Sequence, residues 1–351
     1  MIMCGDNNIS KRISWIDVAK GLGIFFIVWG HVLRTGHFRI YLYTFNVTIF
    51  FFLLGYTFKN NVSLKMLFKK RFLKTMIPYY IWAVLSIMIF LLMAKFLSFE
   101  VTNASMSLWK NLVGMFYANS RTIYMRWNLP LWFIPCMNLT LVIIWLIENM
   151  NQKLIKISSE KFRVGVCFVF ATVGIIMPYL IDIKFPFQFE SAILMTAFVE
   201  LGLIFKGCGI IEFVSNKKLS LLVCAALLIA GITSAEINGL AEVRSYDYGK
   251  YPILFLVSAC SMTVFVVLIS YKINSNFIME RIGQISFPIL LMHKFPILFF
   301  QSVLPMTRVL LEKPDTVEGF LCSIIVAFIS IGMCYIGVLI VKRFAPIIIG
   351  G

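Results

Sequence analysis

The chain has 351 residues, of which 60% are hydrophobic and 14% are charged, and its formal net charge is +16. So large an apolar fraction excludes a soluble domain of this size. Repeated apolar stretches of about 20 residues indicate a polytopic α-helical membrane protein. We expect no nucleic-acid partner, because the basic residues lie mostly in the short segments between the apolar stretches, where they set topology and meet lipid. The eight cysteines form no C-x-x-C pair and indicate neither a metal site nor a disulfide framework.

The apolar stretches predict about ten transmembrane helices in a single all-α membrane domain that covers residues 1–351. The predicted spans lie near residues 13–33, 40–58, 76–97, 131–149, 164–181, 191–211, 219–235, 252–271, 285–304 and 320–341. Lysines and arginines are more numerous in the segments that share a side with the two termini. The positive-inside rule therefore predicts that both termini are cytoplasmic, in a multi-pass protein of the cell (plasma or inner) membrane.

The first predicted span carries three ionisable residues, Asp17, Lys20 and His31. Charged groups inside a membrane span are costly and usually mark a functional path. Lys20 and His31 are about three helical turns apart, so both lie on one face of the helix, roughly 16 Å from each other along its axis. Asp17 precedes Lys20 by one turn and lies near the same stripe. We predict a polar seam along this helix that ends in an imidazole.

The segment that follows the second span is strongly basic. Lys70, Arg71 and Lys74 stand in it, shortly before Pro78. Two interpretations are open for this cluster. It is either an orientation and lipid-headgroup signal, or a docking site for an anionic soluble ligand. In the second case Arg71 and Lys74 would grip phosphates together, because they are one helical turn apart.

Further candidates belong to a second binding site, which we place toward the outward side of the membrane. They are Asn46, Trp132, Glu190 and His293. A tryptophan at a membrane boundary ordinarily anchors the interfacial belt, so stacking on a sugar is the alternative for Trp132. A lone membrane histidine such as His293 is often only a helix–helix hydrogen bond. The outward loop 235–251 is the most polar external loop, which suits a hydrophilic acceptor as well as plain solvation.

An imidazole suits general-base chemistry, because small environmental changes decide whether it is charged near neutral pH. One arrangement uses both the polar seam and the basic cluster. A coenzyme A thioester binds by its phosphates at the cluster and extends past Lys20 to His31, which deprotonates an acceptor hydroxyl. Lys20 or a backbone amide then stabilises the oxyanion, and a transient acyl-imidazole is a variant. The same intramembrane charges also suit a proton-coupled transporter or a sensory module.

At these residues the chain resembles the membrane acyltransferase-3 family and, within it, the fucose 4-O-acetylase-like group. The most specific match is in the first span, where Lys20 is followed by ten residues and then His31. The other matching motifs are Phe51–Tyr56, Arg71-x-x-Lys74, Pro130–Phe133, Leu201-Gly-x-x-x-Lys206, Tyr248-Gly249 and Gly283-x-x-Ser286 with His293. The chain departs from the family pattern at Lys20 and Lys74, where arginine is common, and at Asn46, Thr48 and Leu54.

The resemblance implies about ten helices, acyl-CoA taken from the cytoplasm, acylation of sugars in surface polysaccharides or lipid-linked glycans, and an essential histidine in the first span. We accordingly predict an O-acetyltransferase with acetyl-CoA as co-substrate and with neither a metal nor a permanently bound cofactor. The predicted catalytic group is His31 as base, Lys20 to position or polarise the thioester and Asp17 to orient Lys20. The predicted donor contacts are Lys70, Arg71 and Lys74, and the predicted acceptor contacts are Asn46, Trp132, Glu190 and His293. The partners expected are acyl-CoA, a carbohydrate acceptor and membrane lipids; a glycan or solute transporter is the alternative.

Overall fold

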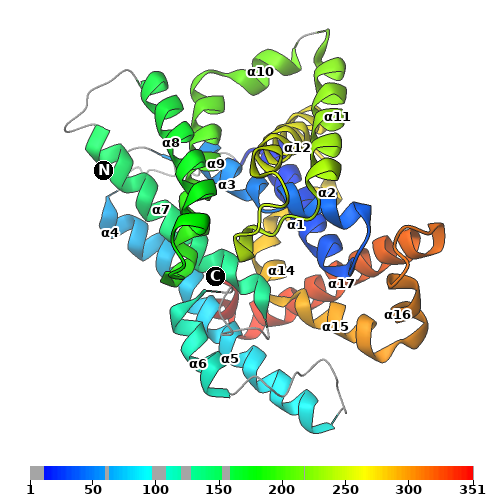
Figure 1. The fold of residues 1–351 in the computed structure, drawn as a ribbon. Helices are drawn as coiled ribbons and strands as arrows, with labels where there is room; N and C mark the ends of the chain where they lie inside the picture. Colours follow the sequence, from blue (N-terminus) through cyan, green and yellow to red (C-terminus); the bar gives the residue numbers. More distant parts are fainter. Residues whose placement is uncertain are drawn as a thin grey trace, which may run out of the picture.

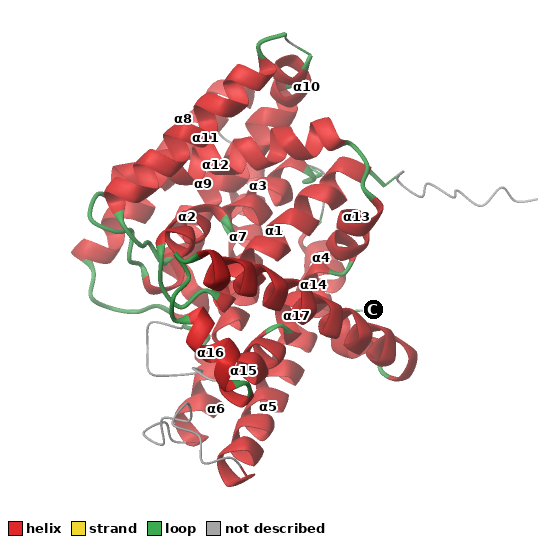
Figure 2. Cartoon of the chain, turned by 90° about the vertical axis from the view of Figure 1, so that its right-hand side faces the viewer, coloured by secondary structure: helices red, strands yellow, loops and turns green. Residues whose placement is uncertain are grey.

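The computed structural model describes residues 12–59, 63–96, 108–119, 128–151, 159–216 and 218–350. Across these ranges the chain is helical, without a named strand, and nine helical segments are long and apolar enough to cross a membrane. A tenth is added if the bent pair Lys294–Gln301 and Pro305–Leu311 is one broken span. The predicted fold class, an all-α polytopic membrane protein, is therefore confirmed (Figures 1 and 2).

The helices follow one another in the order shown in Figure 1. The N-terminal third comprises α1 (Ser14–Val32), α2 (His37–Phe45), α3 (Thr48–Tyr56), α4 (Leu64–Leu67), the π-helical turn η1 (Phe68–Phe72), α5 (Leu73–Phe96) and α6 (Leu108–Tyr117). The middle comprises η2 (Leu129–Trp132), α7 (Phe133–Met150), α8 (Ser159–Leu180), η4 (Pro186–Gln188), α9 (Phe189–Gly207), α10 (Ile210–Ser215) and α11 (Ser220–Asn238). The remainder comprises η5 (Val243–Ser245), α12 (Pro252–Ile273), α13 (Phe277–Gln284), α14 (Ser286–Met292), α15 (Lys294–Val303), α16 (Pro305–Leu311), α17 (Val317–Phe344) and η6 (Pro346–Ile349).

Helix α1 is an interior helix of the bundle. About 78% of its span is buried inside the protein, against 11% for α8, whose apolar side chains are left to face lipid. Figures 1 and 2 agree in placing α8 at the edge of the bundle and α1 inside it. The ionisable residues of the first span are therefore enclosed by other helices, as their cost in lipid requires.

Two pairs of glycines allow the central helices to approach one another closely. A Cβ on Gly21 would collide with the backbone carbonyl of Met279 in α13, and one on Gly283 would collide with the carbonyl of Asp17 in α1. Helices α3 and α9 approach equally closely at Gly55 and Gly202, where an added Cβ would collide with the backbone of the facing helix. Helices in lipid gain little from burying apolar surface, so close backbone contact is a main source of their association.

Two predicted spans are interrupted in the structure. The second span consists of α2 and α3, which are separated at Asn46 and Val47. The stretch predicted as a span over 285–304 consists of two helices, α14 and α15, which meet at His293. After α15 the backbone of Leu304 is extended, as expected for the residue before Pro305, and the chain turns by 101°.

The two ends of the described chain lie on the same side as the basic segment. The Trp82 indole of α5 donates to the Ile348 carbonyl of η6 at 3.0 Å, and Arg12 lines a cavity together with Arg71. This arrangement agrees with two termini on one face of the membrane. That this face is the cytoplasmic one stays a prediction.

Candidate active site

Two cavities lie in succession along α1. The first has a volume of about 300 Å³ and contains His31, while the second has a volume of about 410 Å³ and contains Lys20. Three apolar side chains line both of them, namely Ile27 of α1, Phe133 of α7 and Leu290 of α14. We call this trio the septum. One face of α1 carries Lys20, Ile27 and His31. The predicted polar seam is therefore interrupted by one apolar residue, Ile27, between Lys20 and His31.

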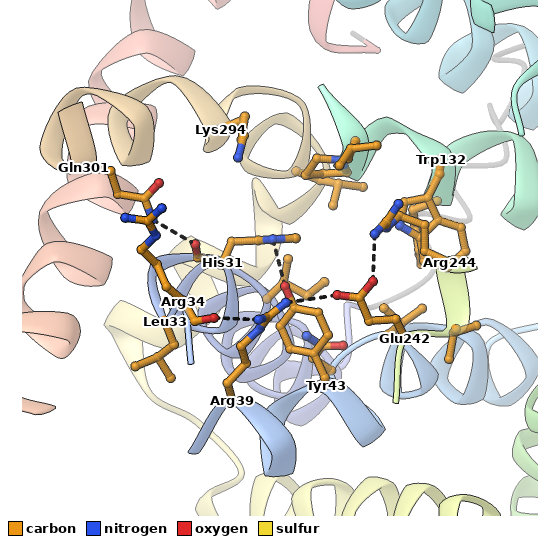
Figure 3. A pocket seen from close by; sticks show the side chains of 18 residues that line it. His31, Leu33, Arg34, Arg39, Tyr43, Trp132, Glu242, Arg244, Lys294 and Gln301 are labelled. Atoms are coloured by element: carbon orange, nitrogen blue, oxygen red, sulfur yellow. Dashed lines mark hydrogen bonds and ion pairs between the residues drawn. The ribbon is translucent and has the colours of Figure 1, made fainter. Parts of the chain in front are cut away.

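His31 stands in the last turn of α1, where its ring faces the first cavity (Figure 3). The Tyr43 hydroxyl lies 3.3 Å from its Nδ1. If that nitrogen carries the proton and donates it to the Tyr43 oxygen, Nε2 is left with a lone pair. The Gln301 amide donates to the backbone carbonyl of His31 at 3.4 Å and so ties the end of α1 to α15. Tyr43 and Gln301 thus hold the ring and the backbone of His31 at the edge of the first cavity.

His293 packs directly behind His31. The two ring centroids are 5.3 Å apart, and His293 is completely buried. Its Nδ1 donates to the Ile289 carbonyl at 3.0 Å, and its Nε2 has no hydrogen-bond partner among the described residues. His293 is outside the lining of the first cavity. From this position His293 can support the His31 ring. The predicted contact between His293 and the acceptor stays a prediction.

The wall of the first cavity is strongly cationic. Arg34, Arg39, Arg244 and Lys294 line it, with Glu242 as the carboxylate among the lining residues (Figure 3). Glu242 accepts from Arg39 at 3.0 Å and from Arg244 at 2.7 Å. Arg39 also lies over the Tyr43 ring, 4.7 Å from its centroid. Charge and aromatic surface are therefore combined on the wall that faces His31.

The polar loop 239–251, which carries Glu242 and Arg244, is held by buried hydrogen bonds. The Tyr246 hydroxyl donates to the Gln188 side chain at 2.6 Å and accepts from the Asn119 amide at 2.8 Å. The Ser191 hydroxyl donates to the Val243 carbonyl at 2.9 Å. Burial raises the pKa of Tyr246 well above its usual range, so the phenol stays protonated. These hydrogen bonds hold the loop in place as a wall of the cavity. A loop that was merely solvated would lack such buried contacts.

The second cavity holds the inner part of the predicted site. Asp17 is buried and bridges two cations, with Arg12 Nε at 2.6 Å and Lys20 Nζ at 3.5 Å. Arg71 lines the same cavity from the π-helical turn η1, and burial lowers its pKa without discharging a guanidinium. Lys74 is exposed and lies outside the lining. The side chain of Lys70 lies outside the described part of the structure.

The structure brings some predicted residues together and separates others. His31, Asn46 and Trp132 line the first cavity, while Lys20 and Arg71 line the second. Glu190 is buried elsewhere, where its carboxylate accepts from the Phe185 backbone at 3.1 Å. Polar lining residues that the sequence analysis did not assign to the site include Arg34, Arg39, Tyr43, Lys294 and Gln301. A signal existed for two of them, because Arg39 and Tyr43 are one turn apart at the start of the second span.

Fold and site together define an integral membrane protein with two back-to-back compartments, one that holds a histidine and one that holds basic residues. The chain belongs to the acyltransferase-3 family, whose family model, described as an acyltransferase domain, matches residues 13–340. It is therefore a membrane acyltransferase. No curated protein and no solved structure matches the chain.

Proposed function

We propose that the protein is an O-acetyltransferase that moves the acetyl group of cytoplasmic acetyl-CoA to a hydroxyl of a surface polysaccharide or lipid-linked glycan. The observation that carries this proposal is the alignment of two cavities along α1, with His31 in one, Lys20 and Arg71 in the other, and only the septum between them. A donor with a charged nucleotide head and a long narrow arm fits such a path, because its two ends need different surroundings.

The donor end of this path is the second cavity. Arg71 contacts the coenzyme A phosphates, because a guanidinium offers them paired donors. Lys20 lies about three turns of α1 away from His31, in the other cavity. We therefore assign Lys20 to positioning the donor arm, with Asp17 holding its ammonium. Lys74 is exposed and gives the phosphates a weaker, solvent-screened attraction.

The transfer step takes place in the first cavity. His31 Nε2 removes the proton of the acceptor hydroxyl while the hydroxyl oxygen bonds to the thioester carbonyl carbon. The carbon–sulfur bond then breaks, and the proton passes to the departing thiolate, so the products are the acetyl ester and free coenzyme A. The Tyr43 hydroxyl contacts Nδ1 and orients the ring, and the step uses the tautomer in which Nδ1 carries the proton and Nε2 the lone pair.

The septum separates the two substrates until transfer. The thioester passes between Ile27, Phe133 and Leu290 to reach His31, and these apolar side chains keep water of the first cavity from the second. Trp132 and Asn46 offer the acceptor an aromatic face and an amide. Aromatic faces stack on the apolar side of a sugar ring, which orients one hydroxyl toward His31.

Release of free thiol by purified protein tests this function. Detergent-purified protein is mixed with acetyl-CoA and with surface glycan isolated from cells that lack the chain. The proposal predicts thiol release that needs both substrates and an equal number of new acetyl esters on the glycan. A transporter would release no thiol under these conditions, and that result would refute the enzymatic proposal.

A further inference from the structure

The first cavity carries more positive charge than the proposed transfer step uses. Its lining has four cationic side chains and one carboxylate. A thioester carbonyl develops a single oxyanion, which one or two donors stabilise. The hydroxyl of a neutral sugar calls for no cation at all. The excess charge therefore requires another explanation.

Part of this charge has no anionic partner inside the cavity. Glu242 is shared by Arg39 and Arg244. Among the residues that the structure describes, the Arg34 guanidinium pairs with Glu312 alone, at 3.5 Å on an exposed surface. Lys294 forms no ion pair within the described ranges. Lys294 is mostly removed from water, whereas the Arg34 side chain is 47% exposed. A cation that is mostly removed from water and lacks a counter-charge is costly, so a group such as Lys294 usually serves a ligand.

One buried donor points to the same conclusion. The Nε of Arg39 is buried and has no hydrogen-bond acceptor among the described residues, although both terminal nitrogens of that guanidinium are engaged. Buried donors are nearly always paired in folded proteins. An oxyanion in the cavity would give this Nε an acceptor, on the wall that His31 faces.

We propose that the acceptor is anionic: it carries a carboxylate or a phosphate close to the hydroxyl that receives the acetyl group. This inference rests on the proposed function. Arg34, Arg39 and Lys294 would hold the oxyanion, while Trp132 holds the sugar face. The coenzyme A phosphates are an unsuitable occupant, because the thioester must reach His31 with its nucleotide still in the second cavity. The oxyanion belongs either to the sugar, as a carboxylate, or to a phosphate linkage of the glycan or its lipid carrier.

Mass spectrometry of the surface glycan, from cells with and without the chain, identifies the residue that gains the acetyl group. The proposal predicts an acetyl on an acidic sugar or on a sugar next to a phosphate. An acetyl within a wholly neutral glycan would overturn it while leaving the proposed function intact. The absence of any acetyl difference would instead count against the proposed function.

Chemical removal of each anion distinguishes its two sources. The isolated glycan is treated with carbodiimide and borohydride, which reduces carboxylates to alcohols, or with aqueous hydrofluoric acid, which removes phosphates. One of the two treatments is expected to lower thiol release from the purified enzyme at least about tenfold, equivalent to the loss of a charged hydrogen bond. Unchanged release after both treatments would overturn the proposal.

The Lys294→Gln variant tests the cationic wall itself. We expect the KM for isolated glycan to rise about tenfold and the KM for acetyl-CoA to stay within about twofold, with recovery in Lys294→Arg. Lys250→Gln is the matched control, because Lys250 is an exposed cation of loop 239–251 outside the cavity lining. A rise in the KM for acetyl-CoA with an unchanged KM for glycan would show that the wall serves the donor and would refute the inference.

Discussion

Replacing Tyr43 with phenylalanine removes one atom from the site and leaves the rest of the side chain in place. The lost hydroxyl lies 3.3 Å from His31 Nδ1. The aromatic ring stays, with its edge contact to the His31 ring at 5.9 Å and its contact with Arg39. A neutral hydrogen bond contributes about 1 kcal/mol net, so losing this one is expected to lower kcat about fivefold.

The kinetic pattern should be specific, because the hydroxyl orients the base and does not contact either substrate in this account. Thiol release is measured over a range of acetyl-CoA and glycan concentrations. We expect kcat to fall while both KM values stay within about twofold. Tyr41→Phe is the matched control, since Tyr41 lies two residues away on α2 and outside the first cavity. An unchanged kcat in Tyr43→Phe, or an equal loss in Tyr41→Phe, would refute the role given to Tyr43.

Three further predictions concern the donor cavity, the septum and the helix packing. Arg71→Ala should raise the KM for acetyl-CoA about tenfold and Lys74→Ala much less, because Arg71 lines the second cavity and Lys74 does not. Equal effects in a titration of acetyl-CoA would contradict this. Phe133→Ala should open the septum and increase the rate of acetyl-CoA hydrolysis measured without glycan. A hydrolysis rate no higher than that of the wild type would argue that the septum does not keep water from the thioester. Gly283→Ala should destabilise the protein by about 2 kcal/mol in detergent thermal unfolding, since its Cβ overlaps the α1 backbone. Gly332→Ala is the control, because a Cβ there meets open space. Equal unfolding midpoints for the two variants would disprove the contact.

The fold class was predictable because its signal is local. Runs of apolar residues give the spans, and a charged group inside a run marks an interior helix. Both conditions hold for α1, which is enclosed and carries Asp17, Lys20 and His31. Interruptions within a run were harder to predict. The stretch 285–304 is mostly apolar in its two helices, and the change of helix at His293 coincides with Lys294 and Pro296, a local signal that a hydropathy window averages out.

The candidate site was only partly predictable, because its contacts join distant parts of the chain. Helical spacing places Lys20 and His31 on one face of α1, and the structure agrees. It cannot show that Phe133 and Leu290 come from two other helices to close the space between them. The cationic wall also depends on contacts between distant parts of the chain, since Arg39 and Glu242, which form an ion pair, are 203 residues apart in sequence.

In the proposed mechanism His31 removes the proton of the acceptor hydroxyl, and thiol release by His31→Ala measures that role. We expect acceptor-dependent release to fall at least about a hundredfold, because the general base is removed, while the unfolding midpoint stays unchanged. His37→Ala, at an exposed histidine outside the cavity, should retain full activity. Acceptor-dependent release by His31→Ala at the wild-type rate would contradict the account.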